Sequence, residues 1–270
     1  MEAGLQRLLG VPGVVEGLRI TWLGHSTVLV ESAGVRVLTD PVLRPRLLHL
    51  RRVDGGAVVP PDVDAVLVSH AHYDHLDVRS LRLVGAPTIV VPKGARRIVA
   101  KARSRTVVEL EAGEQISIGG LAVRATPAFH DARRHPLAAV VPPLGFLLTG
   151  SRRVYFAGDT DLFEGMRDLA EGLDVALLPI AGWGPRVPAG HLDPRRAAEA
   201  LRLLRPRVAI PIHWGTYRRR GMPSDPQTLR GPADEFETLA AVRAPDVTVA
   251  TLEPGQAFDL PARTGTGAGS

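Results

Sequence analysis

The stretch of residues 65–77 constrains this chain most, because an apolar run leads directly into a cluster of metal-binding side chains. The run is predicted to form a buried strand, so His70 and His72, two positions apart, leave its end on the same side. Asp74 and His75 follow in the turn, which can direct them to a second point nearby. Metal ions need imidazoles or carboxylates that converge on one point. The stretch therefore predicts bound metal rather than a His-rich surface loop.

Short β-branched runs recur along the chain, and three of them lead to a further histidine or aspartate. Predicted strands cover residues 20–22, 27–31, 35–39, 65–69, 88–91, 121–125, 154–157, 175–178 and 208–212. One strand runs towards His130, another ends at Asp159, and the last ends at His213. These strand ends offer three more candidate metal ligands.

Helical patterns lie between the strands. They cover residues 79–84, 94–102, 161–171, 194–204 and 233–242. Asp77 is the expected cap of the first helix, and Asp193 is that of the fourth, which has Pro194 in its first position. Strands mixed with surface helices predict layered sheets that are covered outside by helices. No repeat of fixed period is present, which argues against solenoids and propellers.

Length and composition bound the domain organisation. With 270 residues, of which 45% are hydrophobic, the chain can form one large domain or two small ones around an ample core. No linker divides it, so we expect a single domain over residues 1–260 and a flexible, Gly-rich tail over residues 261–270. The sequence has no long apolar stretch and starts without a basic leader, which favours a cytoplasmic protein without stable membrane insertion.

The residue types present exclude several kinds of site. Without cysteine the chain has no disulfide, thiolate ligand or cysteine nucleophile, so nitrogen and oxygen atoms must hold any metal. The formal net charge of +5 comes almost entirely from arginine, since Lys93 and Lys101 are the only lysines. The arginines are spread along the whole chain, which argues against nucleic acid as a partner. The sequence gives no indication of the oligomeric state.

Six sequence blocks occur together in an order that is typical of a known family. They cover residues 21–27, 38–41, 70–77, 156–160, 191–194 and 212–216. Over roughly residues 18–258 the chain resembles the metallo-β-lactamase superfamily, in the branch with N-acyl-phosphatidylethanolamine phospholipase D and the ascorbate-6-phosphate lactonases. The resemblance implies an α/β fold of the αββα type, in which two mixed β-sheets pack face to face with helices on both outer faces.

The resemblance also implies a centre with two divalent metal ions. One ion would be held by His70, His72 and His130, the other by Asp74, His75 and His213, and Asp159 would bridge them. Zn²⁺ is the usual occupant in such proteins, with Mn²⁺ or Fe as alternatives. Two such ions lower the pKa of a shared water from 15.7 toward about 7. We expect the resulting hydroxide, oriented by Asp74, to attack an ester-type bond while one ion stabilises the oxyanion.

Three polar residues beside these blocks are expected to support the centre. His191 lies in a His-x-Asp-Pro block, where related phospholipases have a histidine near the substrate, so it is a candidate proton donor to the leaving group. The alternative is that His191 only makes hydrogen bonds within its loop. His25 and Asp40 are expected to brace the metal ligands, because ligating imidazoles usually donate their second N–H to a carboxylate or carbonyl.

The remaining aromatic, basic and histidine positions have weaker signals. Trp22, Trp183 and Trp214 are expected in the core or in a pocket wall. Arg218, Arg219 and Arg220 either meet a substrate phosphate at the rim of the cleft or form a solvated loop. His49 and His135 are interpreted as surface residues.

The resemblance favours hydrolysis of a phosphodiester in a small or lipid-like, anionic substrate, with a phosphorylated sugar lactone as the alternative. A membrane-facing lipid groove is not expected, because about nineteen residues precede the first strand and Asp131 follows His130 where an aromatic residue is common. Two other functions are open. An oxygen-using iron enzyme would need only one of the two sites, and a non-catalytic binding module would tolerate loss of ligands, yet none is missing.

Overall fold

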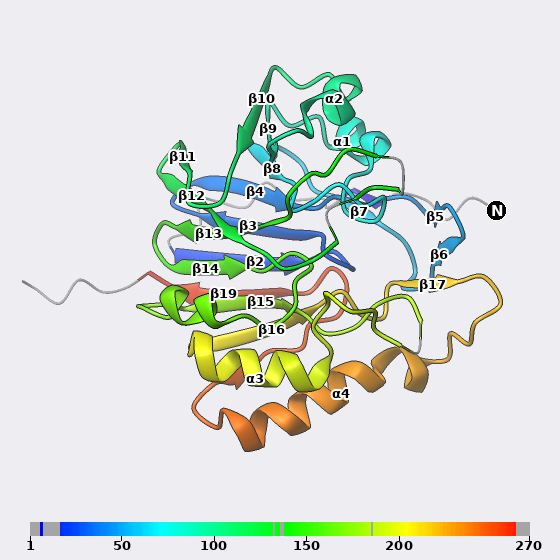
Figure 1. The fold of residues 1–270 in the computed structure, drawn as a ribbon, viewed down its shortest axis with the longest axis vertical. Helices are drawn as coiled ribbons and strands as arrows, with labels where there is room; N and C mark the ends of the chain where they lie inside the picture. Colours follow the sequence, from blue (N-terminus) through cyan, green and yellow to red (C-terminus); the bar gives the residue numbers. More distant parts are fainter. Residues whose placement is uncertain (1–5, 8–16, 132, 136–137, 185, 263–270) are drawn as a thin grey trace, which may run out of the picture.

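The computed structural model describes residues 6–7, 17–131, 133–135, 138–184 and 186–262. Two seven-stranded sheets dominate these residues, and each contains both parallel and antiparallel pairs. Figure 1 shows the strands stacked through the middle of the molecule, with α1 and α2 at one end of the stack and α3 and α4 at the other. The predicted αββα arrangement is confirmed.

The strand order of each sheet is as follows. The first sheet runs β10 (Thr106–Leu110), β9 (Thr88–Pro92), β8 (Ala65–Leu67), β4 (Val35–Thr39), β3 (Val28–Ser32), β2 (Gly17–Trp22), β19 (Ala257–Pro261). The second runs β11 (Gln115–Ile118), β12 (Leu121–Pro127), β13 (Leu144–Thr149), β14 (Arg153–Phe156), β15 (Val175–Pro179), β16 (Val208–Ile212), β18 (Thr248–Val249). Two small sheets contain β17 (Tyr217–Arg219), β6 (Leu50–Arg52) and β5 (Arg46–Leu47), and β1 (Gln6–Arg7) and β7 (Val58–Val59).

The helices cover the outer faces of the two large sheets. They are α1 (Val78–Val84), α2 (Arg96–Val99) and the 3₁₀ turn η1 (Ala100–Ala102) beside the first sheet, and the 3₁₀ helix η2 (Glu164–Leu169), α3 (Pro194–Leu204) and α4 (Pro226–Arg243) beside the second.

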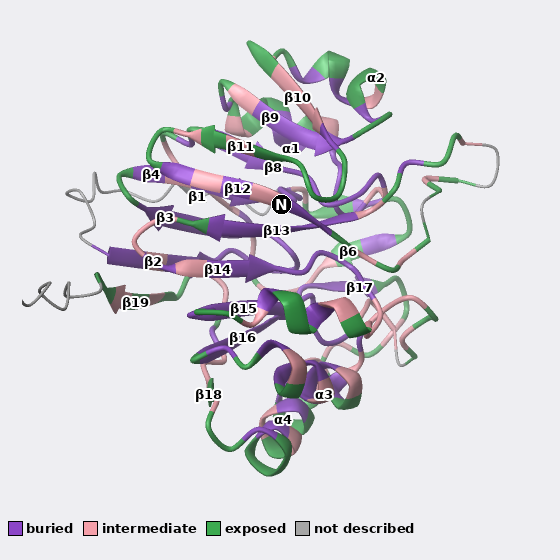
Figure 2. Cartoon of the chain, turned by 60° about the vertical axis from the view of Figure 1, so that its left-hand side comes forward, coloured by how far each residue is buried: buried purple, intermediate pink, exposed green. Residues whose placement is uncertain are grey.

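The pleat of the strands produces this layering. In β3, Val28 and Val30 point to the inner core, where they share a cluster with Phe146 of the second sheet. Leu29 points the other way and joins a cluster with Leu81 of α1. Successive side chains of a strand face opposite sides, so a strand that is apolar throughout can bury both faces. Figure 2 accordingly shows the central strands as buried and much of the helical surface as exposed.

Most of the predicted helices are present, and their capping residues act as expected. Asp77 accepts a hydrogen bond from the Ser80 backbone N–H, and Asp193 accepts one from Arg196. The helix predicted over residues 194–204 has those bounds.

Three of the predicted helices differ from the structure in type or length. The helix predicted over residues 161–171 is wrong, because residues 164–169 form a 3₁₀ helix; Gly165 in its first turn weakens an α-helix. The helix predicted over residues 94–102 is split between α2 and η1. The last helix begins earlier than predicted, at Pro226, where Asp225 forms the cap.

Five strands of the two large sheets were not predicted. They are β10, β11, β13, β18 and β19. The last of them reaches Pro261, one residue into the predicted tail, and residues 263–270 lie outside the described residues. The expectation about a leader falls on residues 1–5, which also lie outside them. Within the described part of the chain, no helix combines the length and the apolar character needed to cross a membrane.

Candidate metal centre

Strand ends from both large sheets meet above one edge of the molecule and deliver the candidate ligands. His70 and His72 follow β8 of the first sheet. His130 follows β12, Asp159 follows β14 and His213 follows β16 of the second sheet. Since β14, β15 and β16 are parallel neighbours, their carboxyl ends lie at the same edge. The fold therefore gathers residues that are far apart in the sequence.

The first group of candidate ligands contains only histidines. The ring nitrogens of His70, His72 and His130 include one from each residue that lie within 4.8 Å of one another. Nδ1 of His130 donates to the Gly190 carbonyl at 2.9 Å, and Nε2 of His72 donates to the Arg133 carbonyl at 2.8 Å. The opposite nitrogens of these two rings are 3.0 Å apart. Each ring is thus anchored at one nitrogen and presents the lone pair of the other.

Asp40 connects the first group to the second. Its Oδ1 accepts the Ser69 backbone N–H at 2.7 Å, and its Oδ2 accepts the Ser69 hydroxyl at 2.5 Å. The same Oδ2 accepts Nδ1–H of His75 at 2.7 Å. Because the Ser69 hydroxyl donates to Asp40, its oxygen is left to accept Nδ1–H of His70, 2.9 Å away. Asp40 therefore sets the tautomer of an imidazole in each group, as predicted for a bracing residue.

The second group mixes imidazoles with a carboxylate. It consists of His25, Asp74, His75 and His213, with one ligand atom from each within 4.8 Å of the others. Nε2 of His75 and Nε2 of His213 are 3.3 Å apart, and Nδ1 of His213 donates to the Ala181 carbonyl at 2.9 Å. The indole N–H of Trp183 donates to Oδ2 of Asp74 at 2.7 Å. This second set of nitrogen and oxygen atoms also converges.

Asp159 lies between the two groups. Its Oδ2 is 3.1 Å from Nε2 of His75 and 3.4 Å from Nε2 of His213. It also forms a group with His130 of the first set and with His191, whose Nε2 is 3.4 Å away. Its Oδ1 is buried and has no hydrogen-bond partner among the described residues. This position is the one expected of a bridging carboxylate.

Burial and mutual electrostatics divide the charges at the centre. Burial lowers the pKa of His70 well below its usual range and that of His130 to about 4. For Asp74 and Asp159, burial acts to raise the pKa, but the surrounding imidazoles outweigh it and the pKa of each falls well below its ordinary value. Burial also opposes the charge of His75, but the two carboxylates raise its pKa. The metal-free centre therefore combines ionised carboxylates with neutral rings of His70 and His130 and a His75 ring whose protonated form is favoured.

These donor atoms fit divalent metal ions. Nε2 of His70 and Oδ1 of Asp159 are buried without a hydrogen-bond partner in the described part of the chain. A buried polar atom without a partner costs free energy, and a bound cation removes that cost. Imidazole nitrogens and carboxylate oxygens are the ligands that zinc, manganese and iron accept when no thiolate is present.

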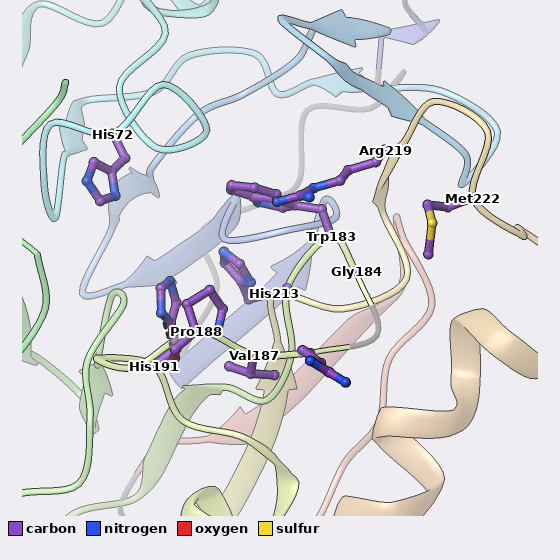
Figure 3. Close-up of a pocket in the computed structure, with 11 residues that line it drawn as sticks. His72, Trp183, Gly184, Val187, Pro188, His191, His213, Arg219 and Met222 are labelled. Atoms are coloured by element: carbon purple, nitrogen blue, oxygen red, sulfur yellow. Dashed lines mark hydrogen bonds between the residues drawn. The ribbon is translucent and has the colours of Figure 1, made fainter. Parts of the chain in front are cut away.

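A cleft opens over the metal centre. A cavity of about 690 Å³ is lined by His72, His191 and His213 together with Trp183 and Arg219. Figure 3 shows these side chains around the opening, with the Arg219 side chain lying along the Trp183 ring. A smaller cavity of about 230 Å³ shares His72 and Trp183 with the first and continues along an apolar wall that includes Leu47 and Leu50. A substrate can thus approach the ligands from solvent.

Comparison with known proteins assigns the family. A family model described as "Beta-lactamase superfamily domain" matches residues 35–214, which is more than half of the chain. The chain belongs to the metallo-β-lactamase superfamily. The resemblance inferred from the six sequence blocks is therefore confirmed.

Relatives across this superfamily match nearly the entire length of the protein. A metal-dependent hydrolase from Methanopyrus kandleri is 34% identical and is aligned over 90% of this chain and 100% of its own. The N-acyl-phosphatidylethanolamine-hydrolyzing phospholipase D 1 of Caenorhabditis elegans is 31% identical over 90% of this chain and 76% of its own. The solved structure of Igni18, a metallo hydrolase from Ignicoccus hospitalis, is 26% identical with a TM-score of 0.65, over 90% and 99% of the two chains. Fold, family and the buried histidine and aspartate cluster agree with a metal-dependent hydrolase.

In this metallo-β-lactamase domain all seven predicted ligand side chains lie at one place, and the neighbouring predictions can be located beside them. His191 borders both the cleft and Asp159. Its Nδ1 lies 3.3 Å from the Pro188 and Ala189 carbonyls. His25, predicted to brace the centre, lies within the second group itself.

The aromatic and basic predictions separate once the chain is folded. Trp22 and Trp214 stack in the core with ring centroids 5.0 Å apart. Arg218 is buried and donates through Nε to the Pro223 carbonyl, whereas Arg219 lines the cleft and Arg220 is exposed. The imidazoles of His49 and His135 belong to exposed residues, as predicted.

Two supporting contacts of this metallo-β-lactamase centre were missed from the sequence. Trp183 holds Asp74 through its indole N–H, although it lies in a loop more than a hundred positions away. Thr216 accepts the backbone N–H of His25 at 2.7 Å. Thr216 ends one of the recognised blocks, so its position was noticed without its role; nothing in the sequence around Trp183 indicates the contact.

Proposed function

We propose that the protein is a hydrolase that uses two divalent metal ions to cleave a phosphodiester. His70, His72 and His130 would hold the first ion, Asp74, His75 and His213 the second, and Asp159 both. The observation that carries this assignment is the position of Asp159, within 3.1–3.4 Å of Nε2 atoms in His75 and His213 and in one ligand group with His130. Two bound ions supply a water nucleophile at neutral pH and stabilise negative charge on the reacting ester.

Zinc is the ion that this donor set supports best. Five imidazoles and two carboxylates without sulfur suit zinc, and they also suit manganese and iron. Metal analysis of the purified protein checks the choice. Two equivalents of zinc in a colourless protein would agree with hydrolysis, while bound iron with an optical spectrum would favour the oxygen-using alternative.

The chain's own residues have separate tasks in the proposed reaction. Trp183 donates to Oδ2 of Asp74 and so fixes the direction of that carboxylate. Asp40 holds His75 through its Nδ1–H. His191 lies at the cleft with Nε2 3.4 Å from Asp159, and the carboxylate raises its pKa against the opposing effect of burial. A protonated His191 can therefore donate a proton to the leaving oxygen.

The charge of the cleft supports an anionic substrate. Arg186 and Arg219 line the larger cavity, and none of the described residues that line it carries a carboxylate. Neither guanidinium has an ion-pair partner among the described residues, and that of Arg219 lies 5.4 Å from the centre of the Trp183 ring. Unpaired guanidinium groups at a cleft attract phosphate oxygens. A phosphodiester satisfies this feature; a phosphorylated lactone, the second candidate, would satisfy it through a phosphate remote from the bond that is cleaved.

Replacement of Asp159 by alanine tests the dinuclear scheme. Removing the bridging carboxylate should eliminate bound metal from at least one site and lower hydrolysis of bis-p-nitrophenyl phosphate by a factor of about 10³ or more, because water activation depends on both ions. Metal content by mass spectrometry and the rate of p-nitrophenol release are the measurements. Asp168→Ala, which changes an exposed aspartate outside the ligand groups, is the control. Full activity in a fully metallated Asp159→Ala protein would refute the scheme.

Parallel assays decide between the candidate substrates and the non-catalytic alternative. The metal-loaded protein is offered bis-p-nitrophenyl phosphate and a phosphorylated sugar lactone. Preferred hydrolysis of the diester supports the proposal, and preferred opening of the lactone supports the second candidate. If a protein with two bound ions hydrolyses neither, the binding-module interpretation is favoured instead.

Replacement of Arg219 by glutamine tests whether the cleft selects anions. Losing one charged hydrogen-bonding group of this kind costs about 1.5 kcal/mol, so the KM for the anionic diester should rise roughly tenfold. The KM for neutral p-nitrophenyl acetate should not change. Arg220→Gln, which alters an exposed neighbour outside the cavity lining, is the control. Equal effects of Arg219→Gln on both substrates would contradict selection by charge.

A further inference from the structure

The loop between β2 and β3 holds His25 in a constrained position at the metal centre. Its backbone is left-handed, with φ of 54°, a conformation that residues other than glycine seldom adopt. The His25 N–H donates to Thr216 Oγ1 at 2.7 Å, and its carbonyl accepts the Trp22 indole N–H at 2.8 Å and the His213 N–H at 3.0 Å. Strained backbone that several contacts hold in place is characteristic of functional sites.

The imidazole of His25 is directed at the second group of ligand atoms. The residue is 2% exposed, and its ring centroid is 4.0 Å from that of His213. Its Nε2 lies 3.3 Å from Asp74 Oδ2, and it belongs to the same set of atoms within 4.8 Å as those of Asp74, His75 and His213. Spacings of this size are expected between atoms that share one ion, given metal–nitrogen and metal–oxygen distances of about 2.0–2.2 Å.

Nε2 of His25 is buried, and it has no hydrogen-bond partner in the part of the chain that the structure describes. Among the described residues the same is true of Nε2 of His70 and Oδ1 of Asp159, two atoms that belong to proposed ligands. A neutral imidazole with its proton on Nδ1 offers a lone pair at Nε2. A ring that served only to brace Asp74 would need Nε2–H to donate to that carboxylate.

We propose that His25 is a direct ligand of the second metal ion, rather than a bracing residue behind it. This inference rests on the dinuclear centre proposed above and adds an eighth ligand to it. The second ion would then have five protein ligands, namely His25, Asp74, His75, His213 and Asp159. The first ion would have four, namely His70, His72, His130 and Asp159.

The unequal ligand sets predict unequal behaviour of the two ions. The second ion, with more protein ligands, is held more tightly and has fewer positions for water or substrate. The first ion keeps more open coordination, as catalytic sites do. A chelator should therefore remove one ion from the wild-type protein well before the other.

Nuclear magnetic resonance of the intact wild-type protein tests the coordination directly. Protein labelled with ¹⁵N in its histidines is loaded with ¹¹³Cd²⁺, and a nitrogen bonded to cadmium shows a one-bond coupling. We expect coupling at the Nε2 of His25 as well as at the other five proposed imidazoles. The His25 resonance is assigned by its absence from the His25→Asn spectrum. Coupling at the other rings but none at His25 would overturn the inference, whereas no coupling at any ring would instead refute the dinuclear centre.

Stepwise metal removal from variants gives a second, independent readout. His25→Ala should lower the affinity of the more tightly held ion at least tenfold in a chelator titration, so that the two ions leave at similar chelator concentrations. His49→Ala, which changes an exposed histidine, should keep the two separate steps. Circular dichroism confirms that each variant is folded. Two unchanged steps in a folded His25→Ala protein would contradict direct ligation, and if this variant does not fold, the wild-type cadmium spectrum decides.

Discussion

Single hydrogen bonds behind the imidazoles define the chemistry of the centre. Asp40, the Gly190 carbonyl and the Ala181 carbonyl each hold the outer nitrogen of a ring whose inner nitrogen points to the ligand groups. An outer partner fixes both the tautomer and the direction of the ring, and its loss in metalloproteins typically lowers metal affinity 10- to 100-fold. The ligands are thus useful only together with residues that touch no metal.

His191 has a different position, since it faces the cleft without belonging to the proposed ligand set. We expect His191→Gln to retain both ions and to lower kcat about 100-fold for diesters with poor leaving groups, because glutamine cannot transfer a proton. The p-nitrophenyl ester, whose leaving group needs little protonation, should be affected far less. Rates for a series of leaving groups provide the measurement. An equal loss across the series would indicate that His191 has only a structural role.

At the scale of elements, α3 is a packing element rather than a part of the metal centre. Its cap Asp193 and first residue Pro194 start it, and Leu201 is fully buried against the second sheet and α4. Leu201→Ala should therefore reduce the free energy of unfolding by about 2–5 kcal/mol, since the truncation leaves a cavity. Chemical denaturation of metal-loaded protein measures this change.

The exposed neighbour Arg202 supplies the control for this element. Arg202→Ala should change the free energy of unfolding by no more than about 0.5 kcal/mol, because its contact with Glu199 is an exposed ion pair. Metal content should remain the same in both variants. Loss of metal from a folded Leu201→Ala protein would show that α3 also positions the ligands.

Elements that local signals define were predicted well, and those that depend on neighbours were not. The caps at Asp77 and Asp193 are local, and the helices that follow them were found. By contrast β13, Leu-Gly-Phe-Leu-Leu-Thr, has one β-branched residue, and it is a strand because β12 and β14 pair with it on both sides. The edge strand β19 likewise depends on pairing with β2, more than two hundred residues away.

At the scale of the molecule, the centre concentrates buried titratable groups and so links folding to pH. Burial lowers the pKa of His25 to about 3 and of His130 to about 4, from an ordinary value of 6.5. Between these values the unfolded chain binds protons that the folded chain does not. The free energy of unfolding of the metal-free protein should therefore fall as the pH falls from 6.5 to about 4. His75, whose pKa is raised above 6.5, contributes a stabilisation that is fully present within this window and is lost only as the pH rises above it.

Denaturation of chelator-treated protein across this pH range checks the expected slope. His130→Gln should reduce the slope, because one of the responsible groups is removed. Metal-loaded protein should be more stable than metal-free protein at pH 7, since ions that bind only the folded state stabilise it. A stability of the metal-free protein that rises on acidification from 6.5 would contradict the assignment of neutral, buried imidazoles.

The sequence by itself determined the αββα layering, the family and the residues that gather as candidate ligands. Apolar runs predicted the strands of the layered sheets, and ligand-grade side chains directly after strands marked the candidate ligands. The αββα type and the family came from the resemblance of the six sequence blocks. Only the tertiary structure decided how these side chains divide into groups, that His25 lies among them, and that Trp183 rather than a neighbour in sequence holds Asp74. Those contacts join segments brought together by sheet packing, and distances between such segments are set by the packed core and not by any local pattern.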